Sequence, residues 1–392
     1  MAYKVFSNGD ALTGSELNTY LMNQSVIQFA STTARDAAIP SPAEGQLVWL
    51  QDVNKYVYYT GSAWADLITP AGGDNAIING AFDIWQRGTS FASPADGLYT
   101  ADRFITFQNG TGATRTISQQ TFTPGTAPVA GYESSYFFRY LCSNLGSGNS
   151  YQAMQNRIED VRTFAGQTVT FSFWAKADSA KTITLALIQN FGSGGSSAVN
   201  VDVATTFSLT TSWTRFTRTV AVPSIAGKTI GAGSFLQLGF ELGSQVITFD
   251  TWGWQLESGS TATTFRRNAV NFAEELASCK RYYQRFNSIN TYGLFGFGKA
   301  YNGSTLNLVF SLPVQMRTTP NAIETSAMST IQFETGSTSG NTPTSITLNA
   351  FTSTPSIVGA DLNKSGAFST GAFYFVQASN SASAYIAFGA EL

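Results

Sequence analysis

Short stretches in which apolar and polar residues alternate recur along most of this chain. In the stretch 169–176 every second residue is apolar, and residues 236–242 repeat the pattern with leucine and phenylalanine. Successive side chains of a strand point to opposite faces, so this alternation predicts strands buried on one side. Many such strands, separated by turns such as Asn79-Gly80 and Asn109-Gly110, predict a mainly β protein of the sandwich or jelly-roll kind with few short helices.

The first 70 residues predict a separate module of helix and hairpin. Thr13 and Glu16 have the spacing of a capping box, which starts a helix. A short, mixed stripe follows at helical spacing and is expected to serve attachment or an oligomer seam: Leu17, Tyr20, Leu21, Gln24 and Ile27. Residues 47–50 and 56–59 predict a hairpin that ends near Trp64.

A Pro- and Gly-rich linker near residue 72 separates this module from the rest. We expect a central β-sandwich over 75–287, closed by a helix at 271–286, and a C-terminal β-sandwich over 288–392. The helix would present Leu276, Cys279, Tyr282 or Tyr283, and Phe286 as its apolar stripe. It suits a cover for the sandwich, a three-fold seam or an interdomain joint equally well.

The composition argues against catalysis. The chain contains no histidine, and only 12% of its residues are charged. The lack of histidine rules out a Ser-His-Asp catalytic triad, a Cys-His catalytic dyad and the usual zinc sites. Paired carboxylates remain as a route to glycan hydrolysis, and the candidates are Glu159, Asp160, Glu241, Asp250 and Glu257. Their spacing in the sequence does not show whether two of them lie within reach of one sugar, and for Glu159 and Glu257 we expect salt bridges to Arg157 or to Arg266 and Arg267.

Charge and hydropathy restrict the partners. The net charge is −2, which offers no basic field to a nucleic acid, and no apolar run is long enough for membrane insertion. The N-terminus lacks the layout of a signal peptide. Cys142 and Cys279 match no metal spacing and are predicted to be buried free thiols, with a disulfide left open. No cofactor and no metal are predicted, although Asn79 and Asp250 have oxygen ligands of the kind that calcium takes.

Aromatic residues on polar faces are the best candidates for ligand binding. Sugar rings stack on tryptophan while their hydroxyls bond to amides and carboxylates. In the stretch 246–257 we expect Ile247 and Phe249 to face the core and the tryptophans to face away. The predicted carbohydrate-binding set is Trp174, Gln237, Glu241, Asp250, Trp252 and Trp254. The same face would also suit packing against a neighbouring subunit or the second sheet.

Several motifs resemble those of phage tail fibres and related virion proteins. Residues 5–13 and 17–22, with the hairpin ending in Trp64, resemble their N-terminal modules. The motifs at 79–88, 101–104, 171–177 and 254–265 resemble a carbohydrate-binding-module-like jelly roll, which a helix like 274–286 commonly closes. Residues 312–320 resemble the start of a C-terminal β head.

The resemblance implies a homotrimer in the virion, assembled in the host cytoplasm. Its N-terminus would attach to other tail or virion proteins, and its distal β domains would contact host surface polysaccharide or lipopolysaccharide. Residues 288–392 are the expected tip. A purely structural baseplate, collar, head-fibre or adaptor protein is the alternative, and a glycan depolymerase is a further one.

Overall fold

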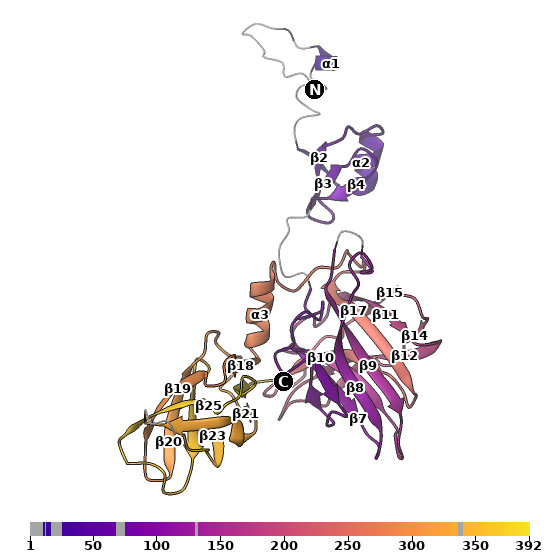
Figure 1. Ribbon diagram of the computed structural model, residues 1–392. Coiled ribbons are helices and arrows are strands. Elements are labelled where there is room, and N and C mark those ends of the chain that lie inside the picture. Colours follow the sequence, from indigo (N-terminus) through magenta and orange to yellow (C-terminus); the bar gives the residue numbers. More distant parts are fainter. Residues whose placement is uncertain (1–10, 12, 17–25, 68–74, 130–131, 336–339) are drawn as a thin grey trace. The chain divides into compact units, whose positions relative to one another are not determined.

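The computed structural model describes residues 11, 13–16, 26–67, 75–129, 132–335 and 340–392. The chain divides into two compact units, Met1–Ala71 and Gly72–Leu392, which we describe separately (Figure 1). Both are built mainly from strands, which confirms the predicted fold class.

The first unit contains a small four-stranded sheet. Its order is β1 (Ile27–Phe29), β2 (Leu47–Leu50), β3 (Lys55–Tyr59) and β4 (Trp64–Asp66), and β1 runs parallel to β2. The predicted hairpin is confirmed, with Leu50 opposite Lys55. Helix α2 (Thr32–Ala38) is capped by Ser31. Val48, Leu50 and Val57 form the core.

The predicted helical attachment stripe falls largely outside the described residues. Leu17, Tyr20, Leu21 and Gln24 are among those not described, and α1 (Gly14–Glu16) is the short helix before them. For Ile27 the prediction is wrong, because this residue begins β1 and lies opposite Val48. A β-branched residue followed by Gln28 and Phe29 suits a half-buried strand better than a helix.

The second unit begins with a β-sandwich. One sheet has the order β13-β12-β16-β10-β7-β6, with β14 also paired to β12, and the other has the order β15-β11-β17-β9-β8-β5. The strands of the first sheet are β6 (Leu98–Tyr99), β7 (Phe104–Gln108), β10 (Gln152–Glu159), β12 (Lys181–Asn190), β13 (Val199–Asp202), β14 (Thr206–Leu209) and β16 (Phe235–Glu241). The strands of the second are β5 (Ser90–Ala92), β8 (Thr114–Thr121), β9 (Tyr136–Asn144), β11 (Thr168–Ala177), β15 (Thr214–Ala221) and β17 (Ile247–Ser258).

An aromatic core lies between these two sheets. The predicted inward residues of 169–176 and 236–242 are buried, as expected, and belong to this core. Phe173 and Phe240 approach within 4.6 Å between ring centroids, and Trp254 packs at 4.9 Å from Phe240. Cys142 and Cys279 are free and buried, so the predicted thiols are confirmed and no disulfide joins them.

The C-terminal residues form a second sandwich of two unequal sheets. The smaller has the order β18-β26-β21 and the larger the order β22-β25-β19-β20-β24-β23. The smaller sheet consists of β18 (Tyr283–Asn287), β21 (Ala322–Thr325) and β26 (Tyr385–Gly389). The larger consists of β19 (Leu294–Ala300), β20 (Thr305–Ser311), β22 (Ile331–Glu334), β23 (Ser345–Asn349), β24 (Ile357–Asn363) and β25 (Phe373–Ala378), and the 3₁₀ turn η3 (Met328–Thr330) precedes β22. Their facing sides bury a continuous core that includes Leu308, Phe333 and Phe388.

The helix predicted at 271–286 is wrong in its second half. Helix α3 covers Phe272–Lys280 and begins at the cap residue Asn271, whereas Tyr283–Asn287 is strand β18. Tyr283 and Phe286 are three residues apart, which suits a helical stripe, but aromatic residues also favour strands. Pairing with β26, Tyr283 opposite Gly389, decides for the strand.

Buried charged groups join the two sandwiches of this unit. Arg103 forms an ion pair with Glu391 and lies 3.5 Å from the centre of the Tyr282 ring. Arg87 lies 3.5 Å from the centre of the Tyr283 ring and 3.3 Å from a Glu391 oxygen. Of the three predicted roles for this segment, the structure shows that its Tyr-Tyr pair forms an interdomain joint.

Candidate functional site

Two of the three tryptophans of the predicted surface are not exposed. Trp252 and Trp254 both have an exposed fraction of 0%. The Trp252 indole donates to the Ser134 hydroxyl at 2.7 Å and lies beneath Phe122, Tyr132 and Phe265. Neither ring can therefore offer a face to a sugar without a rearrangement.

A β-bulge explains why Trp254 points inward. The pairing of β11 with β17 shifts by one residue between Ser172 and Trp174, so the extra residue in β17 reverses the alternation. Gly253 sits at the shift with φ of +68°, a conformation that glycine adopts readily. The prediction that Asp250, Trp252 and Trp254 share one face is thus wrong for Trp254.

The remaining predicted residues do not form one site. Trp174 and Asp250 lie on β11 and β17 of one sheet, whereas Gln237 and Glu241 lie on β16 of the other. Asp250 is buried and accepts two hydrogen bonds from Arg139, at 2.7 and 2.8 Å. The chain order of the strands gave no indication that they alternate between sheets.

Four of the five candidate carboxylates have structural partners. Glu159 pairs with Arg281 at 3.0 Å, not with the expected Arg157, and Glu257 accepts from the backbone and hydroxyl of Thr263. The Asn79 side chain bonds to the backbone of Ile84 and Asp102, so its oxygen is already used. Among the described residues no cluster of three or more metal-binding side chains is found.

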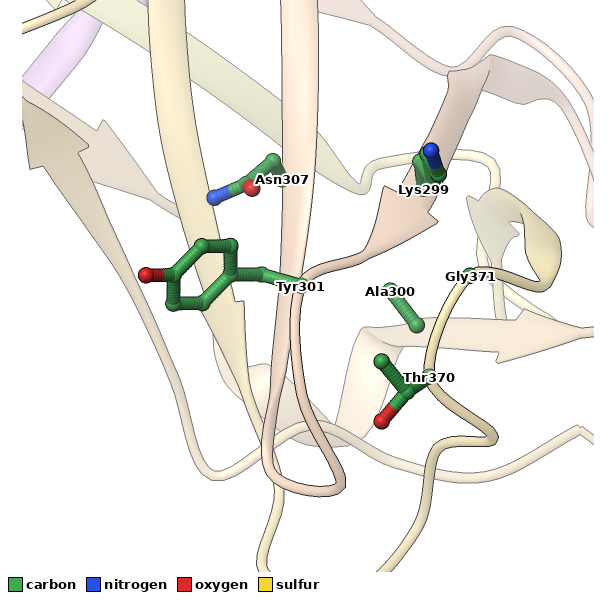
Figure 2. Close-up of a pocket in the computed structure, with 6 residues that line it drawn as sticks. All are labelled: Lys299, Ala300, Tyr301, Asn307, Thr370 and Gly371. Carbon is green, nitrogen blue, oxygen red and sulfur yellow. The ribbon is translucent and has the colours of Figure 1, made fainter.

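Two adjoining cavities open on the C-terminal sandwich instead. One, of about 350 Å³, is lined by Lys299, Ala300, Tyr301, Asn307, Thr370 and Gly371 (Figure 2). The other, of about 430 Å³, is lined by Tyr301, Asn302, Thr305, Asn307, Asn349, Phe351, Thr352 and Asp361. Tyr301 and Asn307 line both, and both volumes lie in the range of small-ligand sites.

The strand register sets the polar floor of these cavities. Lys299 of β19 lies opposite Asn307 of β20, and Asn307 lies opposite Asp361 of β24. Directly opposed residues have side chains on the same face. Three strands therefore contribute a cation, an amide and a carboxylate in one row.

Two turns place aromatic rings beside this floor. The Asn302 side chain accepts from the backbone of Ser304 and Thr305, at 2.7 and 2.9 Å, and closes the hairpin that carries Tyr301. The Asn349 side chain accepts from the backbone of Phe351 at 3.1 Å. Tyr301 is 72% exposed and Phe351 fully exposed, so both ring faces are open to a ligand.

A glycine lets the second turn settle against the sheet. Gly359 of β24 lies opposite Asn349, and a Cβ atom added there would meet the Thr352 hydroxyl oxygen at 1.8 Å. The Ser353 hydroxyl accepts from the Gly359 backbone at 3.1 Å and donates to the Asn349 carbonyl at 2.7 Å. Any larger side chain at residue 359 would push this turn off the sheet.

The amides around Asp361 fix the polarity of the larger cavity. Asn307 donates its amide to one Asp361 oxygen at 2.6 Å, and Asn349 donates to both oxygens at 3.1 and 3.2 Å. A carboxylate can accept about four hydrogen bonds, so Asp361 retains room for a hydroxyl donor. Figure 2 shows the Asn307 amide beside the Tyr301 ring.

This arrangement suits the binding of a polyhydroxylated ring. Exposed aromatic faces can stack on its C–H surface, and the amides and carboxylate can bond to its hydroxyls. The cavity lining holds one carboxylate, Asp361, whereas the usual glycosidase chemistry needs two. The lining therefore supports binding and does not supply that hydrolytic pair.

Sequence reasoning missed these residues. The turn at Asn302-Gly303 and the richness of the C-terminal region in Asn and Phe were the available signals. These signals do not reveal the pairing of β20 with β24, which brings Asn307 and Asp361 into contact although they are 54 residues apart in the sequence.

Comparison with known proteins gives structural neighbours only. No protein-family model matches the chain, and no curated protein matches it. A CBM4 carbohydrate-binding module aligns with 22% identity over 47% of this chain and 99% of its own, at a TM-score of 0.30. The enzymatically active domain of bacteriophage CBA120 tailspike protein 4 aligns with 15% identity over 47% of this chain and 22% of its own length, at a TM-score of 0.32.

A family 11 carbohydrate-binding module from Clostridium thermocellum aligns with 10% identity over 45% of this chain and 98% of its own length, at a TM-score of 0.27. Cyclases from Fischerella sp. TAU also align, with TM-scores of 0.31 and 0.30. These scores are too low to assign a function, which has to be argued from this chain's own geometry. Among the described residues, no helix has the length and hydropathy of a membrane span.

Proposed function

We propose that this protein is a virion component, a phage tail fibre or receptor-binding protein, that holds host surface glycan in the two cavities of its C-terminal sandwich. The motifs at both ends of the chain support the virion assignment, and a homotrimer attached by its N-terminal unit would raise weak single-site affinity by avidity. The protein would bind polysaccharide or lipopolysaccharide without cleaving it.

One observation carries the binding role. Two exposed rings, Tyr301 and Phe351, flank a floor on which Asp361 orients the amides of Asn307 and Asn349. Preoriented polar groups beside open aromatic faces lower the cost of ordering that binding otherwise incurs. Trp252 and Trp254, which first suggested sugar binding, are buried, and we therefore place the proposed site in the C-terminal sandwich.

The test is direct binding of the full chain to a panel of purified bacterial capsular polysaccharides and lipopolysaccharides on a biosensor surface. Tyr301→Ala and Phe351→Ala should each weaken binding roughly 5- to 10-fold, because a lost stacking contact is worth about 1 kcal/mol. Phe272→Ala, which removes a half-exposed ring from α3, is the matched control and should bind as the unmodified chain does.

Three results would contradict the proposal. Equal binding by all variants would show that the glycan lies elsewhere, and new reducing ends in the incubated polysaccharide would show hydrolysis. The protein could instead be detected on purified virus particles by a specific label and yet bind none of the glycans. That result would favour the purely structural baseplate, collar, head-fibre or adaptor role.

Point substitutions are better suited to this test than removal of residues 288–392. Strand β18 already pairs with β26 of the C-terminal sandwich, and Glu391 is the ionic partner of the buried Arg103. Truncation at residue 288 would therefore split a sheet and leave a buried guanidinium without its carboxylate.

A further inference from the structure

The row of side chains that forms the floor of the two cavities continues beyond their edge. Asp361, Asn307 and Lys299 lie directly opposite one another on β24, β20 and β19. Lys299 in turn lies opposite Phe373 on the next strand, β25. Opposed residues have side chains on the same face of a sheet, so the row leads from the cavities to an aromatic ring. With neighbouring strands about 4.8 Å apart, the distance across the sheet from Asp361 to Phe373 is about 14 Å.

Phe373 belongs to a group of exposed aromatic rings beside this row. Phe297 and Phe375 lie opposite each other on β19 and β25, and the Phe297 ring centroid is 6.5 Å from that of Phe373. These three rings, which we call the phenylalanine patch, have exposed fractions of 63%, 48% and 63% for Phe297, Phe375 and Phe373. They present on the order of 300 Å² of apolar surface, which reaches the range of the largest and often functional patch on a soluble monomer.

An apolar row and a polar row lie next to each other on this face. Phe297 precedes Lys299 by two residues in β19, and Phe375 follows Phe373 by two residues in β25. The row of Phe297 and Phe375 therefore runs about 7 Å from the row of Lys299. Sugar rings present C–H surfaces that stack on aromatic faces and hydroxyls that bond to polar side chains. A glycan chain that lies along the two rows can make both kinds of contact at once.

The Lys299 side chain links the cavities to the phenylalanine patch. It lines the smaller cavity, and in the row it lies between Asn307 and Phe373. Its ammonium has three N–H donors, and no described residue forms a hydrogen bond or ion pair with it. These donors are available to the hydroxyl or carboxylate groups of a ligand that passes from the cavities to the patch.

We propose that the C-terminal sandwich binds a stretch of several sugar units of a linear glycan chain, which extends from the two cavities past Lys299 to the phenylalanine patch. This inference rests on the proposed function and narrows its ligand to a polymer. A single sugar held in one cavity would leave Phe297 and Phe373 without a contact. The continuity of the polar row with the patch favours a glycan over a separate protein partner, because one chain then uses both surfaces.

Binding of size-graded oligosaccharides to the full chain tests the inference. The probes are disaccharides, tetrasaccharides and octasaccharides, prepared by partial hydrolysis of the polysaccharide that the chain binds on the biosensor surface. Isothermal titration calorimetry should show an affinity that rises roughly 5-fold or more from the disaccharide to the octasaccharide, because each added stacking contact contributes to binding.

Substitutions then locate the two ends of the bound chain. Phe373→Ala should weaken octasaccharide binding roughly 5-fold and leave disaccharide binding unchanged, whereas Tyr301→Ala should weaken both. Phe297→Ala is a second variant with the same expectation as Phe373→Ala. Phe272→Ala, which removes an exposed ring from α3, is the matched control and should change neither affinity. Far-UV circular dichroism spectra that match that of the unmodified chain establish that the variants fold.

The outcomes separate this inference from the proposed function. If Tyr301→Ala weakens every length while Phe373→Ala and Phe297→Ala weaken none, the glycan occupies the cavities alone and the phenylalanine patch has another occupant, such as a protein. If Phe373→Ala weakens the disaccharide as much as the octasaccharide, the ligand is held at one short site, and the extended path is again wrong. If Tyr301→Ala changes no affinity, or if no polysaccharide binds, the proposed function itself is contradicted and this inference with it.

Discussion

The ion pair between Arg103 and Glu391 should be a main determinant of the joint between the two sandwiches. The Arg103 side chain is 1% exposed and that of Glu391 12%. Glu391→Gln would leave this buried guanidinium without a counter-charge. Removing one partner of a buried pair typically costs about 3–5 kcal/mol.

The structure places the expected cost at the lower end of that range. Arg103 would keep its contact with the Tyr282 ring, 3.5 Å away, and a desolvated contact of this kind is worth about 2 kcal/mol. It would also keep its hydrogen bond to the Arg157 carbonyl. We therefore expect Glu391→Gln to lower the free energy of unfolding of the C-terminal sandwich by about 3 kcal/mol.

A double-mutant cycle separates the pair from its surroundings. Arg103→Met removes the cation while Glu391 keeps Arg87 at 3.3 Å, so its cost should be about 2 kcal/mol. In that background Glu391→Gln should cost only about 1 kcal/mol, which gives a coupling of about 2 kcal/mol. Asp160→Asn is the control, because its pair with Arg162 is exposed on both sides and is worth at most about 1 kcal/mol.

The assay should read the two sandwiches separately, since a chain of several compact parts need not unfold in one step. Native-state hydrogen exchange gives a free energy of opening for each sandwich, from peptides that cover β26 of the C-terminal sandwich and β10 of the central one. The reasoning is refuted if Glu391→Gln changes β26 by less than 1 kcal/mol, or if Asp160→Asn changes it as much.

Three further outcomes follow from the structure. Burial raises the pKa of Asp102 to about 6. The stability that its neutral form contributes is therefore complete below about pH 4 and is lost as the pH rises through 6. In urea titrations from pH 4 to 7, the free energy of unfolding of Asp102→Asn should fall by about 3 kcal/mol less than that of the unmodified chain. Gly359→Ala should displace the turn that carries Phe351 and weaken glycan binding at least as much as Phe351→Ala, with β24 exchange unchanged as evidence of folding. Because burial raises the pKa of both the Cys142 and Cys279 thiols, neither should react with a maleimide at pH 7 until urea unfolds the chain, and rapid labelling of the native protein would show that these sites open.

The sequence predicts local elements well where one pattern has one structural meaning. The hairpin at 47–59 follows from two short runs of strand-forming residues joined by a polar turn, and the inward face of β11 follows from strict alternation. The segment from Tyr283 to Phe286 fits both a helix and a strand, and a long-range partner, β26, selects the strand. Trp254 was misplaced because the shift at Gly253 depends on how β11 and β17 pair, which neither stretch contains alone.

The candidate site lies beyond this limit for the same reason. Composition pointed to the C-terminal region, but the row of Lys299, Asn307 and Asp361 exists only once β19, β20 and β24 are in register. Side chains that share a row are set by pairing between strands distant in sequence, and a one-residue slip would send them to the opposite face. Residues of this kind can be recognised from the sequence as polar and exposed, but not as neighbours.

The joint and the candidate site are linked by the way in which the C-terminal sandwich is built. Its smaller sheet is held to the central sandwich by Arg87 and Arg103, while its larger sheet carries the cavities. A firmly held sandwich presents these cavities with little orientational freedom left to lose, and lost freedom is a principal cost of association. Loosening the joint by Glu391→Gln should therefore weaken multivalent glycan binding more than binding of a single short oligosaccharide, because only the former requires several sites to keep a fixed geometry.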